Sequence, residues 1–469
     1  MAGKWSYKRV EEIALKVAMG PFGSSIKVET FTDTGIPIIS GQHLREAELT
    51  DSEFNFITEE HADSLKNANV QRGDVIFTHA GNIGQVAFIP NHSKYQRYVI
   101  SQRQFYLRCD TSIILPEFVV YYFKSPEGQH KLLANANQVG VPSIARPSSY
   151  LKTIEVPVPS IEEQQIVVRN IKALDAKIRA NRRINQTLEA MTQAIFKSWF
   201  VDFDPVKAKI AAIEQGQDPL RAAMRAISGK TDAELDQMPR EHHDPLAATA
   251  ALFPDAMEES ELGEIPKGWE TAPLSKMIRL IGGGTPKRSE SNYWGGTIPW
   301  FSVKDVPNDG DVWVIDTDEK ITELGLQKSS TKLLHKGTTI ISARGTVGKL
   351  AMVGQEMAMN QSCYGVVGTG GIGDFFNYFN LKFTVETLKR NTHGAVFDTI
   401  TQATFETVTC VKPENSVMKQ FDETVEPLLK SIRSNVFQSR ELADLRDTLL
   451  PKLLSGELSV AETKKQVNL

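Results

Sequence analysis

The chain contains a long internal repeat. Residues 73–84 match residues 337–348 at an offset of 264, with glycines at the same positions in both copies. Further along, the offset becomes 254 and stays constant, as between Leu188 and Leu442. A unit of this length is too large for a solenoid repeat. The repeat therefore predicts two copies of one module, each a globular part followed by a long helix. Such a protein should engage something that offers two similar places to bind.

The bulk composition is that of an ordinary globular protein. The 469 residues are 41% hydrophobic and 23% charged, which is close to typical usage. No apolar run reaches the roughly 18 residues of a membrane span, and the N-terminus lacks the apolar core of a signal peptide. The cysteines Cys109, Cys363 and Cys410 form no CxxC pair. We therefore expect a protein of the reducing cytoplasm, without a membrane partner and without a structural zinc site.

The charge is unevenly distributed along the chain. The formal net charge is −4, but residues 204–268 hold 13 acidic and 7 basic residues, a balance of −6. The remaining chain therefore stands at +2. A mildly basic balance permits DNA binding, but it does not by itself supply tight affinity for phosphates. A basic partner protein could supply the rest.

Each copy begins with a globular part of mixed pattern. In the first copy, short β-rich runs punctuated by Pro and Gly are interrupted by helical patterns near 10–17 and 116–135, as in α+β proteins. The β-rich runs lie at 35–40, 74–78, 85–89, 104–108 and 153–158. The acidic segment 204–262 between the copies combines local helical patterns with several prolines, and we expect a partly ordered tether there.

Each copy continues into a long helix. Ser160 and Glu163 form a capping box at the start of the first helix, and side chains then recur at spacings of 3 and 4, the pattern of a heptad seam. The first seam comprises Ile171, Leu174, Ile178, Asn181, Asn185, Leu188, Thr192, Ile195 and Trp199, and the second comprises Val425, Leu428, Ile432, Asn435, Ser439, Leu442, Arg446, Leu449 and Leu453. Pro427 is expected to kink or weaken the second helix, and Gly456 is a natural C-terminal cap.

Two arrangements of these helices are compatible with the sequence. Each could pack on its own globular part, or the two could pair with each other. A length of about 60 Å at about 1.5 Å per residue is too great for burial in one domain, so pairing is favoured. Each helix leads away from its own globular part, which favours an antiparallel pair. Asn181 and Asn435 are equivalent under the repeat and lie near the helix midpoints, where a facing Asn pair would fix the register at some cost in stability.

Several segments occur in an order typical of a known family. They are GIPIIS at 35–40, VPVPSIEEQQ at 156–165, AIFKSWFVDFD at 194–204, GEIPKGW at 263–269, ARGTVG at 343–348 and LLPKLLSGEL at 449–458. On these segments the chain resembles the specificity subunit of type I restriction–modification systems, and the resemblance extends over nearly its whole length. Two positions depart from the pattern, since Gly354 stands where the first copy has Pro90, and Pro427 lies within the second helix.

The resemblance implies a fold and a division of labour. The fold is α+β, with two similar mixed α/β target recognition domains separated by two long antiparallel coiled-coil helices in a pseudo-twofold internal repeat. In this family each recognition domain reads one half of a split DNA sequence, and the helices act as a spacer and as the docking site for two methyltransferase subunits. Those partners carry S-adenosylmethionine and methylate adenine N6, whereas restriction subunits use ATP and Mg²⁺. The resemblance thus implies a non-catalytic chain that binds no cofactor itself.

The sequence holds no convincing catalytic constellation. Residues 343–350 superficially suggest a phosphate-binding loop, but they lack the first glycine and the final Ser/Thr of that motif, and the first copy has Gln85 in place of Lys349. The run Glu-His-His-Asp at 241–244 could bind a metal, but it has no partner pair at ligand spacing, so a solvated loop is favoured. The Asn/Asp-Pro-Pro-aromatic motif of amino-methyltransferases is missing. A self-sufficient enzyme is therefore the least favoured function.

Polar loops flanked by glycine are the best candidates for DNA contact. Sequence readout needs polar side chains at base edges, and glycine lets the backbone approach phosphates closely. The candidate DNA-binding residues are Gln42, His43, His79, Asn82, Gln102, Arg103 and Arg146 in the first domain and Lys304, Arg344, Thr346, Lys349, Asn360 and Gln361 in the second. For any one of them, a role in a turn or at a strand edge is at least as good an explanation.

The loops around Gly81 and Gly345 are the favoured contacts. Scaffold positions match between the two copies, whereas residues 79–80 read His-Ala and residues 343–344 read Ala-Arg. Matching scaffolds with different polar side chains suit two domains that read different sequences. The target should therefore be asymmetric.

The sequence thus predicts a division of the chain and a leading function. We expect recognition domains at 1–158 and 263–413, long helices at 159–203 and 414–456, an acidic connecting segment at 204–262 and a C-terminal tail at 457–469. The leading hypothesis is a DNA sequence reader and assembly scaffold, whose partners are double-stranded DNA, two methyltransferase subunits and, in complexes that cleave, two restriction subunits. The alternative is a coiled-coil adaptor whose heads bind proteins.

Overall fold

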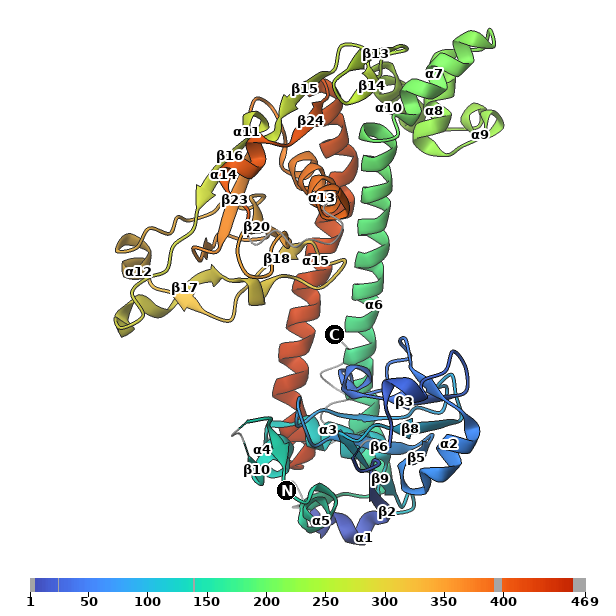
Figure 1. The fold of residues 1–469 in the computed structure, drawn as a ribbon, viewed down its shortest axis with the longest axis vertical. Coiled ribbons are helices and arrows are strands. Elements are labelled where there is room, and N and C mark those ends of the chain that lie inside the picture. The colour runs from blue at the N-terminus through green and yellow to red at the C-terminus, as the bar shows by residue number, and fades with distance from the viewer. Residues whose placement is uncertain (1–4, 24, 138–139, 392–398, 459–469) are drawn as a thin grey trace. The chain divides into compact units, whose positions relative to one another are not determined.

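The structure is a computed structural model, shown in Figure 1. It describes residues 5–23, 25–137, 140–391 and 399–458, so most of the predicted tail at 457–469 lies outside the described residues. The chain divides into two compact units, Met1–Lys177 with Glu441–Leu469 and Ile178–Arg440. Within the described ranges, no helix is both long enough and apolar enough to cross a membrane.

The first unit is built on two four-stranded sheets. One is antiparallel throughout, with the order β2 (Ala14–Met19), β9 (Gln104–Cys109), β6 (Asp74–Thr78) and β7 (Val86–Phe88). The other has the order β4 (Phe56–Ile57), β3 (Ile36–Ile39), β8 (Arg97–Ile100) and β5 (Asn69–Gln71), and its β3–β8 pair is parallel. Two short pairs are β1 (Ser6–Arg9) with β12 (Glu155–Val158) and β10 (Ala136–Asn137) with β11 (Ser143–Ile144).

Strand β6 is the centre of the first unit. All five of its residues are buried. Because side chains alternate along a strand, Val75 and Phe77 join one hydrophobic cluster, whereas Ile76 joins another on the opposite face. The continuous apolar run that predicted a strand at 74–78 is thus a strand covered on both sides.

The helices of the first unit differ from the prediction at two places. They are α1 (Val10–Ile13), α2 (Glu59–Ser64), α3 (Pro116–Lys124), α4 (Pro126–Leu133) and α5 (Pro147–Thr153), with short 3-10 turns η1 (Val28–Thr30), η2 (Gly41–Leu44) and η3 (Lys66–Ala68). The expected helix at 10–17 is only one turn, because the chain from Ala14 pairs with β9. The expected helix at 116–135 is two helices, since Ser125 ends the first and caps the second by accepting the Gly128 N–H at 3.2 Å.

The second unit repeats the same topology. Its main sheet has the order β16 (Ile278–Gly282), β23 (Cys363–Gly368), β20 (Thr339–Ser342), β21 (Leu350–Val353) and β18 (Trp313–Val314). The smaller sheet has the order β19 (Lys320–Ile321), β17 (Trp294–Phe301) and β22 (Ala358–Met359), and β17–β22 is parallel, as β3–β8 is in the first unit. Two further pairs are β15 (Glu270–Pro273) with β24 (Thr409–Lys412) and β13 (Met257–Ser260) with β14 (Gly263–Pro266). The sequence repeat is therefore a repeat of fold, and each copy is a mixed α/β domain.

Helix α13 of the second recognition domain packs against the long helices. The helices of this domain are α11 (Leu274–Met277), α12 (Glu323–Gln327), α13 (Asp374–Asn391) and α14 (Gln402–Glu406), with η4 (Ser291–Tyr293) and η5 (Val303–Asp305). Phe376 of α13 lies within aromatic contact distance of Phe196, Phe200 and Phe421. These rings belong to the largest hydrophobic cluster of the unit, so this domain is anchored on both long helices.

The connecting segment is folded, which corrects the expectation of a partly ordered tether. Its helices are α7 (Asp204–Glu214), α8 (Pro219–Ser228), α9 (Asp232–Asp236) and α10 (Arg240–Ala251). Pro205 and Pro219 stand in the first turns of their helices, where proline is well tolerated, so these prolines start helices instead of interrupting them. A small core of Ala223, Met224, Leu235 and Ala250 joins α8, α9 and α10.

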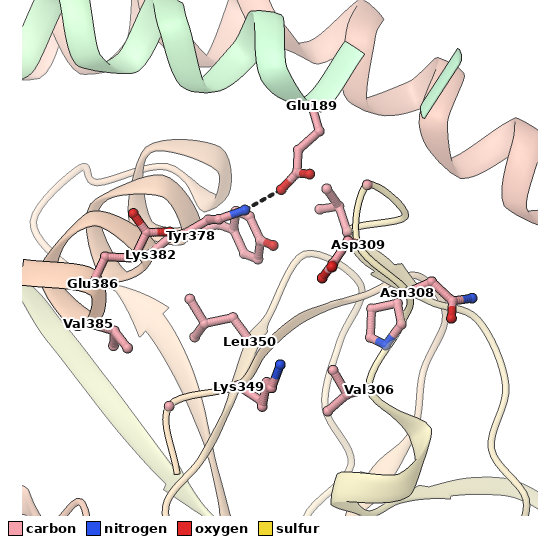
Figure 2. A pocket seen from close by; sticks show the side chains of 14 residues that line it. Glu189, Val306, Asn308, Asp309, Lys349, Leu350, Tyr378, Lys382, Val385 and Glu386 are labelled. Carbon is pink, nitrogen blue, oxygen red and sulfur yellow. Dashed lines mark hydrogen bonds and ion pairs between the residues drawn. The ribbon is translucent and has the colours of Figure 1, made fainter. Parts of the chain in front are cut away.

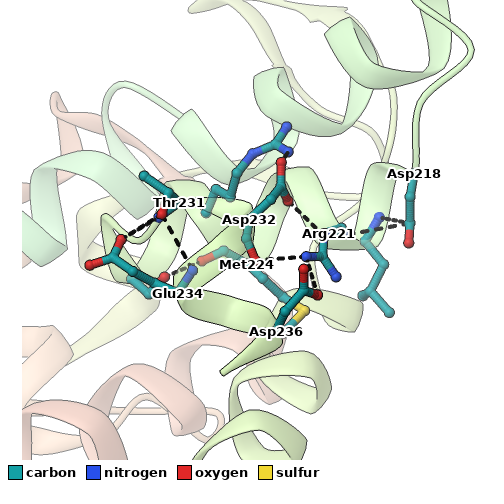
Figure 3. A network of polar contacts seen from close by, with 10 residues as sticks. Asp218, Arg221, Met224, Thr231, Asp232, Glu234 and Asp236 are labelled. Carbon is teal, nitrogen blue, oxygen red and sulfur yellow. Dashed lines mark hydrogen bonds and ion pairs between the residues drawn. The ribbon is translucent and has the colours of Figure 1, made fainter. Parts of the chain in front are cut away.

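Ion pairs also join α8 to α9 (Figure 3). Arg221 donates to Asp232 Oδ1 at 2.6 Å and to Asp236 Oδ1 at 2.5 Å, and Arg225 donates to Asp232 Oδ2 at 2.5 Å. Exposed pairs of this kind each contribute little to stability.

The sequence favoured a solvated loop at 241–244. In the structure these residues instead form the start of α10.

The long helices are α6 (Ile161–Phe200) and α15 (Asn415–Leu454). The predicted capping box is present, because the Ser160 N–H donates to Glu163 Oε2 at 2.9 Å and the Glu163 N–H donates to Ser160 Oγ at 3.3 Å. Helix α15 continues through Pro427 without a break. Past its end, Gly456 adopts φ 72°, the left-handed conformation of a C-terminal cap.

The two long helices are antiparallel within each unit. In the second unit, Asn185 contacts Asn435 and Phe196 contacts Phe421, so residue numbers rise along one helix as they fall along the other. In the first unit, Asp175 accepts a hydrogen bond from Arg446 at 2.9 Å, which follows the same rule. The antiparallel pairing expected from the order of the chain is thus present in both units.

The two central asparagines are neighbours, but their side chains do not bond to each other. Asn181 Nδ2 donates to Gln438 Oε1 at 2.9 Å and to Ser439 Oγ at 3.2 Å, and it lies 3.5 Å from the backbone oxygen of Asn435. Asn435 Nδ2 donates to Asn185 Oδ1 at 2.9 Å. Under the repeat, Asn181 corresponds to Asn435 and Asn185 to Ser439, so the Asn181–Ser439 and Asn185–Asn435 contacts are related by the pseudo-twofold. Its centre lies midway between Asn181 and Asn185, not at Asn181 itself.

Candidate nucleic-acid interface

A glycine-containing loop leaves the end of the main sheet in the first recognition domain. It joins β6 to β7 at residues 79–85. Gly81 and Gly84 have φ values of 83° and 86°, a conformation that side chains other than glycine rarely adopt. The backbone of this loop therefore turns sharply at both glycines.

Backbone hydrogen bonds join this loop to two other segments. The His79 N–H donates to Arg103 O at 2.9 Å, the Ile144 N–H donates to His79 O at 2.8 Å, and the Gly81 N–H donates to Pro142 O at 2.9 Å. The loop at 79–85 thus lies between the β8–β9 turn and the segment around β11. Residues distant in sequence are brought together at one end of the sheet.

Most of the predicted DNA contacts in this domain are exposed on these segments. Arg103 lies against Gly81, since a Cβ added to that glycine would be 3.4 Å from Arg103 Nη1. Arg146 is held at φ 47° immediately before α5. The exposed candidates are Gln42, Asn82, Gln102, Arg103 and Arg146.

His43 is buried, which corrects its prediction as a DNA contact. Only 1% of its surface is exposed, and its ring stacks on Phe54 with centroids 4.4 Å apart. The Ser40 N–H donates to Nδ1 at 3.0 Å, and Nε2 lies 3.2 Å from Glu53 O. Burial lowers the pKa of His43, so a neutral ring with its proton on Nε2 satisfies both contacts. The counterpart Asp305 accepts the Ser302 N–H at 2.8 Å, the same structural role.

His79 supports the neighbouring turn. Its Nε2 lies 3.1 Å from the backbone oxygen of Gln102, and its ring meets Phe105 edge to face. Burial lowers the pKa of His79, so the neutral ring donates from Nε2 to this carbonyl. His79 is half-buried, and the contact steadies the turn that carries Gln102 and Arg103.

The second recognition domain has the same framework. The Ala343 N–H donates to Ser362 O at 2.8 Å, and the Ile400 N–H donates to Ala343 O at 2.9 Å. These bonds correspond to His79 with Arg103 and Ile144 with His79 in the first domain. Residues 345 and 348 are again glycines, with φ values of 76° and 74°. The two loops predicted to be equivalent have equivalent geometry.

The exposed side chains on this framework differ from those of the first domain. Asn360 is only half-exposed, and its Oδ1 accepts the Ser362 N–H at 3.0 Å, so it shapes the turn in which it lies. The exposed candidates are Lys304, Arg344, Thr346, Lys349 and Gln361. Arg344 takes the position of Ala80, since each forms the equivalent isolated β-bridge, with Thr399 and Ser143 respectively.

Ser342 is a supporting residue that was not predicted. Its buried hydroxyl donates to Thr346 O at 2.5 Å and accepts the Lys349 N–H at 2.8 Å. It therefore closes the loop from beneath. The corresponding Thr78 donates to Gln85 Oε1 at 3.2 Å, so a hydroxyl at this position occurs in both copies, which is the signal that could have revealed it.

Comparison with known proteins agrees with this arrangement. Residues 3–190 and 266–415 match the family described as Type I restriction modification DNA specificity domain. The chain belongs to this family. This specificity subunit is 31% identical over 407 residues to the Type I restriction enzyme HindI specificity subunit of Haemophilus influenzae, covering 83% of this chain and 87% of the relative.

The chain is also similar to a second curated relative and to a solved structure. The Type I restriction enzyme MjaIX specificity subunit of Methanocaldococcus jannaschii is 25% identical over 467 residues, covering 98% of this chain and 94% of the relative. Among solved structures, the S subunit of a type I restriction–modification system from M. genitalium has a TM-score of 0.49 at 13% identity, covering 96% of each chain.

A charged cavity of the specificity subunit lies beside the loop that joins β20 to β21 (Figure 2). It has a volume of about 260 Å³ and is lined by Lys349, Asp309 and Tyr378, among others. Lys382 pairs with Glu189 of α6 across its wall. Lys349 therefore belongs to the β20–β21 loop and also lines the cavity at the junction with the long helix. Within the described ranges, no group of three or more His, Cys, Asp or Glu residues is placed to hold a metal ion.

Proposed function

We propose that each recognition domain reads one half of a bipartite, asymmetric DNA target. The observation that carries this proposal is the shared loop framework with different exposed side chains. Both domains hold a glycine loop between two other segments through equivalent backbone bonds. Arg344 of the second loop replaces Ala80 of the first. Equal scaffolds with unequal polar groups would place different hydrogen-bonding patterns against base edges.

Phosphate contacts would position each domain on the duplex. The exposed side chains of Arg103, Arg146, Lys304 and Lys349 supply positive charge, and the loop glycines let the backbone come close to a phosphate. Contacts of this kind set orientation without carrying sequence information. Arg344, Asn82, Gln102 and Gln361 are the side chains that we assign to base readout, because they are exposed on the framework and can pair with base edges.

The helix pair is proposed to set the distance between half-sites and to dock two adenine-N6 methyltransferase subunits. The related contacts Asn181–Ser439 and Asn185–Asn435 give the helix pair local pseudo-twofold symmetry. A nearly symmetric surface suits two identical partners, because each would meet the same side chains. The division of the chain that we propose remains 1–158, 159–203, 204–262, 263–413, 414–456 and 457–469.

Catalysis is assigned to the partner subunits. Methylation would need S-adenosylmethionine on the two methyltransferase subunits, and cleavage would need ATP and Mg²⁺ on restriction subunits. This chain would supply the DNA sequence specificity of the complex. We place the complex in the cytoplasm, where the genomic DNA it would modify is accessible.

Mapping of methylation tests the proposal directly. The chain is co-expressed with its methyltransferase subunits in a host that lacks adenine methylation, and N6-methyladenine is mapped across the genome. The expected result is methylation at one bipartite motif with unequal halves and a gap of constant length. Methylation without a common motif would instead favour a coiled-coil adaptor whose heads bind proteins.

A further inference from the structure

An exposed aromatic side chain lies in the loop after β2, and this loop begins next to the reading turn, which comprises residues 101–103 between β8 and β9. Phe22 is 79% exposed, more than any other large hydrophobic side chain in the described parts of the chain. It lies between Pro21 and Gly23, and Gly23 adopts φ 63° with open space around it. An isolated exposed apolar residue is common on protein surfaces, so exposure alone does not indicate a function. The position of Phe22 in the fold is the informative observation.

Contacts of Gly20 fix where this loop leaves the sheet. The Gly20 N–H donates to Gln104 O at 2.9 Å. A Cβ added to Gly20 would lie 2.1 Å from Ser101 O, so the position accepts only glycine. The loop carrying Phe22 therefore starts directly against the turn that presents Gln102 and Arg103.

The second domain has an equivalent loop, and there the contact with the reading turn is direct. A Cβ added to Gly283 would lie 1.9 Å from Asn360 O, just as a Cβ added to Gly20 would lie against Ser101 O. Thr285 follows Gly283 by two residues, as Phe22 follows Gly20. Thr285 donates from Oγ1 to Gln361 Oε1, and Gln361 corresponds to Gln102. The loops after β2 and β16 therefore both border the reading turns.

We propose that Phe22 is a DNA contact of the first recognition domain, packing its ring against the bases of the first half-site. Thymine methyl groups and base faces are the apolar parts of DNA that an aromatic ring can contact. Val141, which is 66% exposed and precedes Pro142, is a second exposed apolar side chain next to a segment bonded to the loop at Gly81. In the second domain, Thr285 orients Gln361 instead of contributing an aromatic ring. This inference rests on the proposed DNA-reading function.

The test compares the Phe22→Ala complex with wild type, both assembled with methyltransferase subunits. Binding to duplexes carrying the methylation-derived target, and to duplexes altered in one half-site, is measured over a range of salt concentrations. Phe22→Ala should weaken cognate binding about tenfold and reduce discrimination only at the first half-site. Its salt slope should be unchanged, because an apolar contact releases no counterions. Phe22→Trp should retain most of the affinity.

Two further variants make the test specific. Leu15→Ala is the matched control, because Leu15 is 67% exposed near the other end of β2, and it should bind as wild type does. Thr285→Ala should reduce discrimination only at the second half-site. Wild-type affinity and discrimination in Phe22→Ala would overturn the proposal for Phe22 and leave the DNA-reading function intact. A wild-type complex without any sequence preference would instead overturn the proposed function itself.

Discussion

Asn435 donates a hydrogen bond from Nδ2 to Oδ1 of Asn185 at 2.9 Å. Asn185 in turn donates to Asp311 Oδ1 at 3.0 Å, so one buried amide joins α15, α6 and the segment before β18. The backbone of Gly310 packs so closely on α6 that an added Cβ would lie 2.6 Å from Gln186 Cγ. Asn185 therefore holds the helix pair in register and orients the second recognition domain on it.

Replacing Asn185 should destabilise the protein clearly. In Asn185→Ala, the half-buried Asn435 amide and Asp311 carboxylate both lose a partner, and because water can partly replace it, the cost should lie near the lower end of the roughly 1–3 kcal/mol of a fully buried unpaired group. Ser439→Ala at the pseudo-symmetric position is the control, because Asn181 keeps its bond to Gln438 there. Thermal unfolding should show the larger loss for Asn185→Ala. Equal losses in the two variants would contradict the bridging role.

Gly345→Ala should disturb the second reading loop specifically. At φ 76° an alanine is strained by about 1–2 kcal/mol, and no atom would clash with its Cβ. Gly370→Ala is a matched control, since Gly370 has φ 62° and equally open space but lies in the turn after β23. Both should lose similar stability, whereas only Gly345→Ala should lose discrimination at one half-site, measured by binding to altered duplexes. Loss of discrimination in both would point to general destabilisation.

Arg344→Ala should relax recognition at the second half-site. Arg344 is exposed on the reading loop, and a bidentate Arg–base contact contributes about 1–3 kcal/mol of discrimination. Methylation of substrates altered in one half-site should become more permissive for that half only. A uniform weakening with a smaller salt slope would reassign Arg344 to a phosphate, and unchanged methylation would remove it from the interface.

Glycine spacing was sufficient to predict the framework of both reading loops. A left-handed turn admits few residues other than glycine, so matched glycines report matched backbone geometry. The antiparallel pairing of the helices was also predictable, because a heptad seam and the order of the chain are local features. The register of the two helices was harder to predict. An Asn181–Asn435 pair and the contacts that are observed differ by a shift of only one helical turn.

Tertiary contacts decided the features that were predicted wrongly. His43 lies in a polar run that suits a DNA loop, but the aromatic ring of Phe54, eleven residues later in sequence, covers it. Residues 14–17 have a helical pattern, yet they complete a sheet by pairing with β9. The acidic segment suggested a tether because it contains several prolines. Their positions at the starts of helices became evident only from the structure.

Lengthening the helix pair should lengthen the gap between half-sites, if the helices act as a ruler. A heptad inserted at equivalent positions of α6 and α15 preserves the seam and adds about 10 Å. That corresponds to about three base pairs at roughly 3.4 Å each. Motif mapping by N6-methyladenine measures the gap. The same heptad inserted between α9 and α10 is the control and should leave it unchanged, and a gap indifferent to the helix insertions would reject the ruler.

Asp422 should make the stability of the second unit depend on pH. It lies in α15 and accepts the Phe376 N–H at 2.7 Å. Burial, with smaller contributions from Asp374 and Glu426, raises its pKa from 3.8 to about 6. Between these values the unfolded chain releases the proton while the folded chain keeps it. Stability therefore falls as pH rises from about 4 to 6, and the penalty, at most about 3 kcal/mol, persists above pH 6.

Asp422→Asn isolates this effect, because the amide oxygen can still accept the Phe376 N–H but cannot ionise. Thermal unfolding at pH 4 and pH 7 should show that the stability of the variant relative to wild type is greater at pH 7. Glu423→Gln removes an exposed carboxylate from the same helix. The difference in its stability between pH 4 and pH 7 should be the same as in wild type. If Asp422→Asn loses equal stability at both pH values, the carboxylate acts only as a hydrogen-bond acceptor, and its burial carries no ionisation penalty.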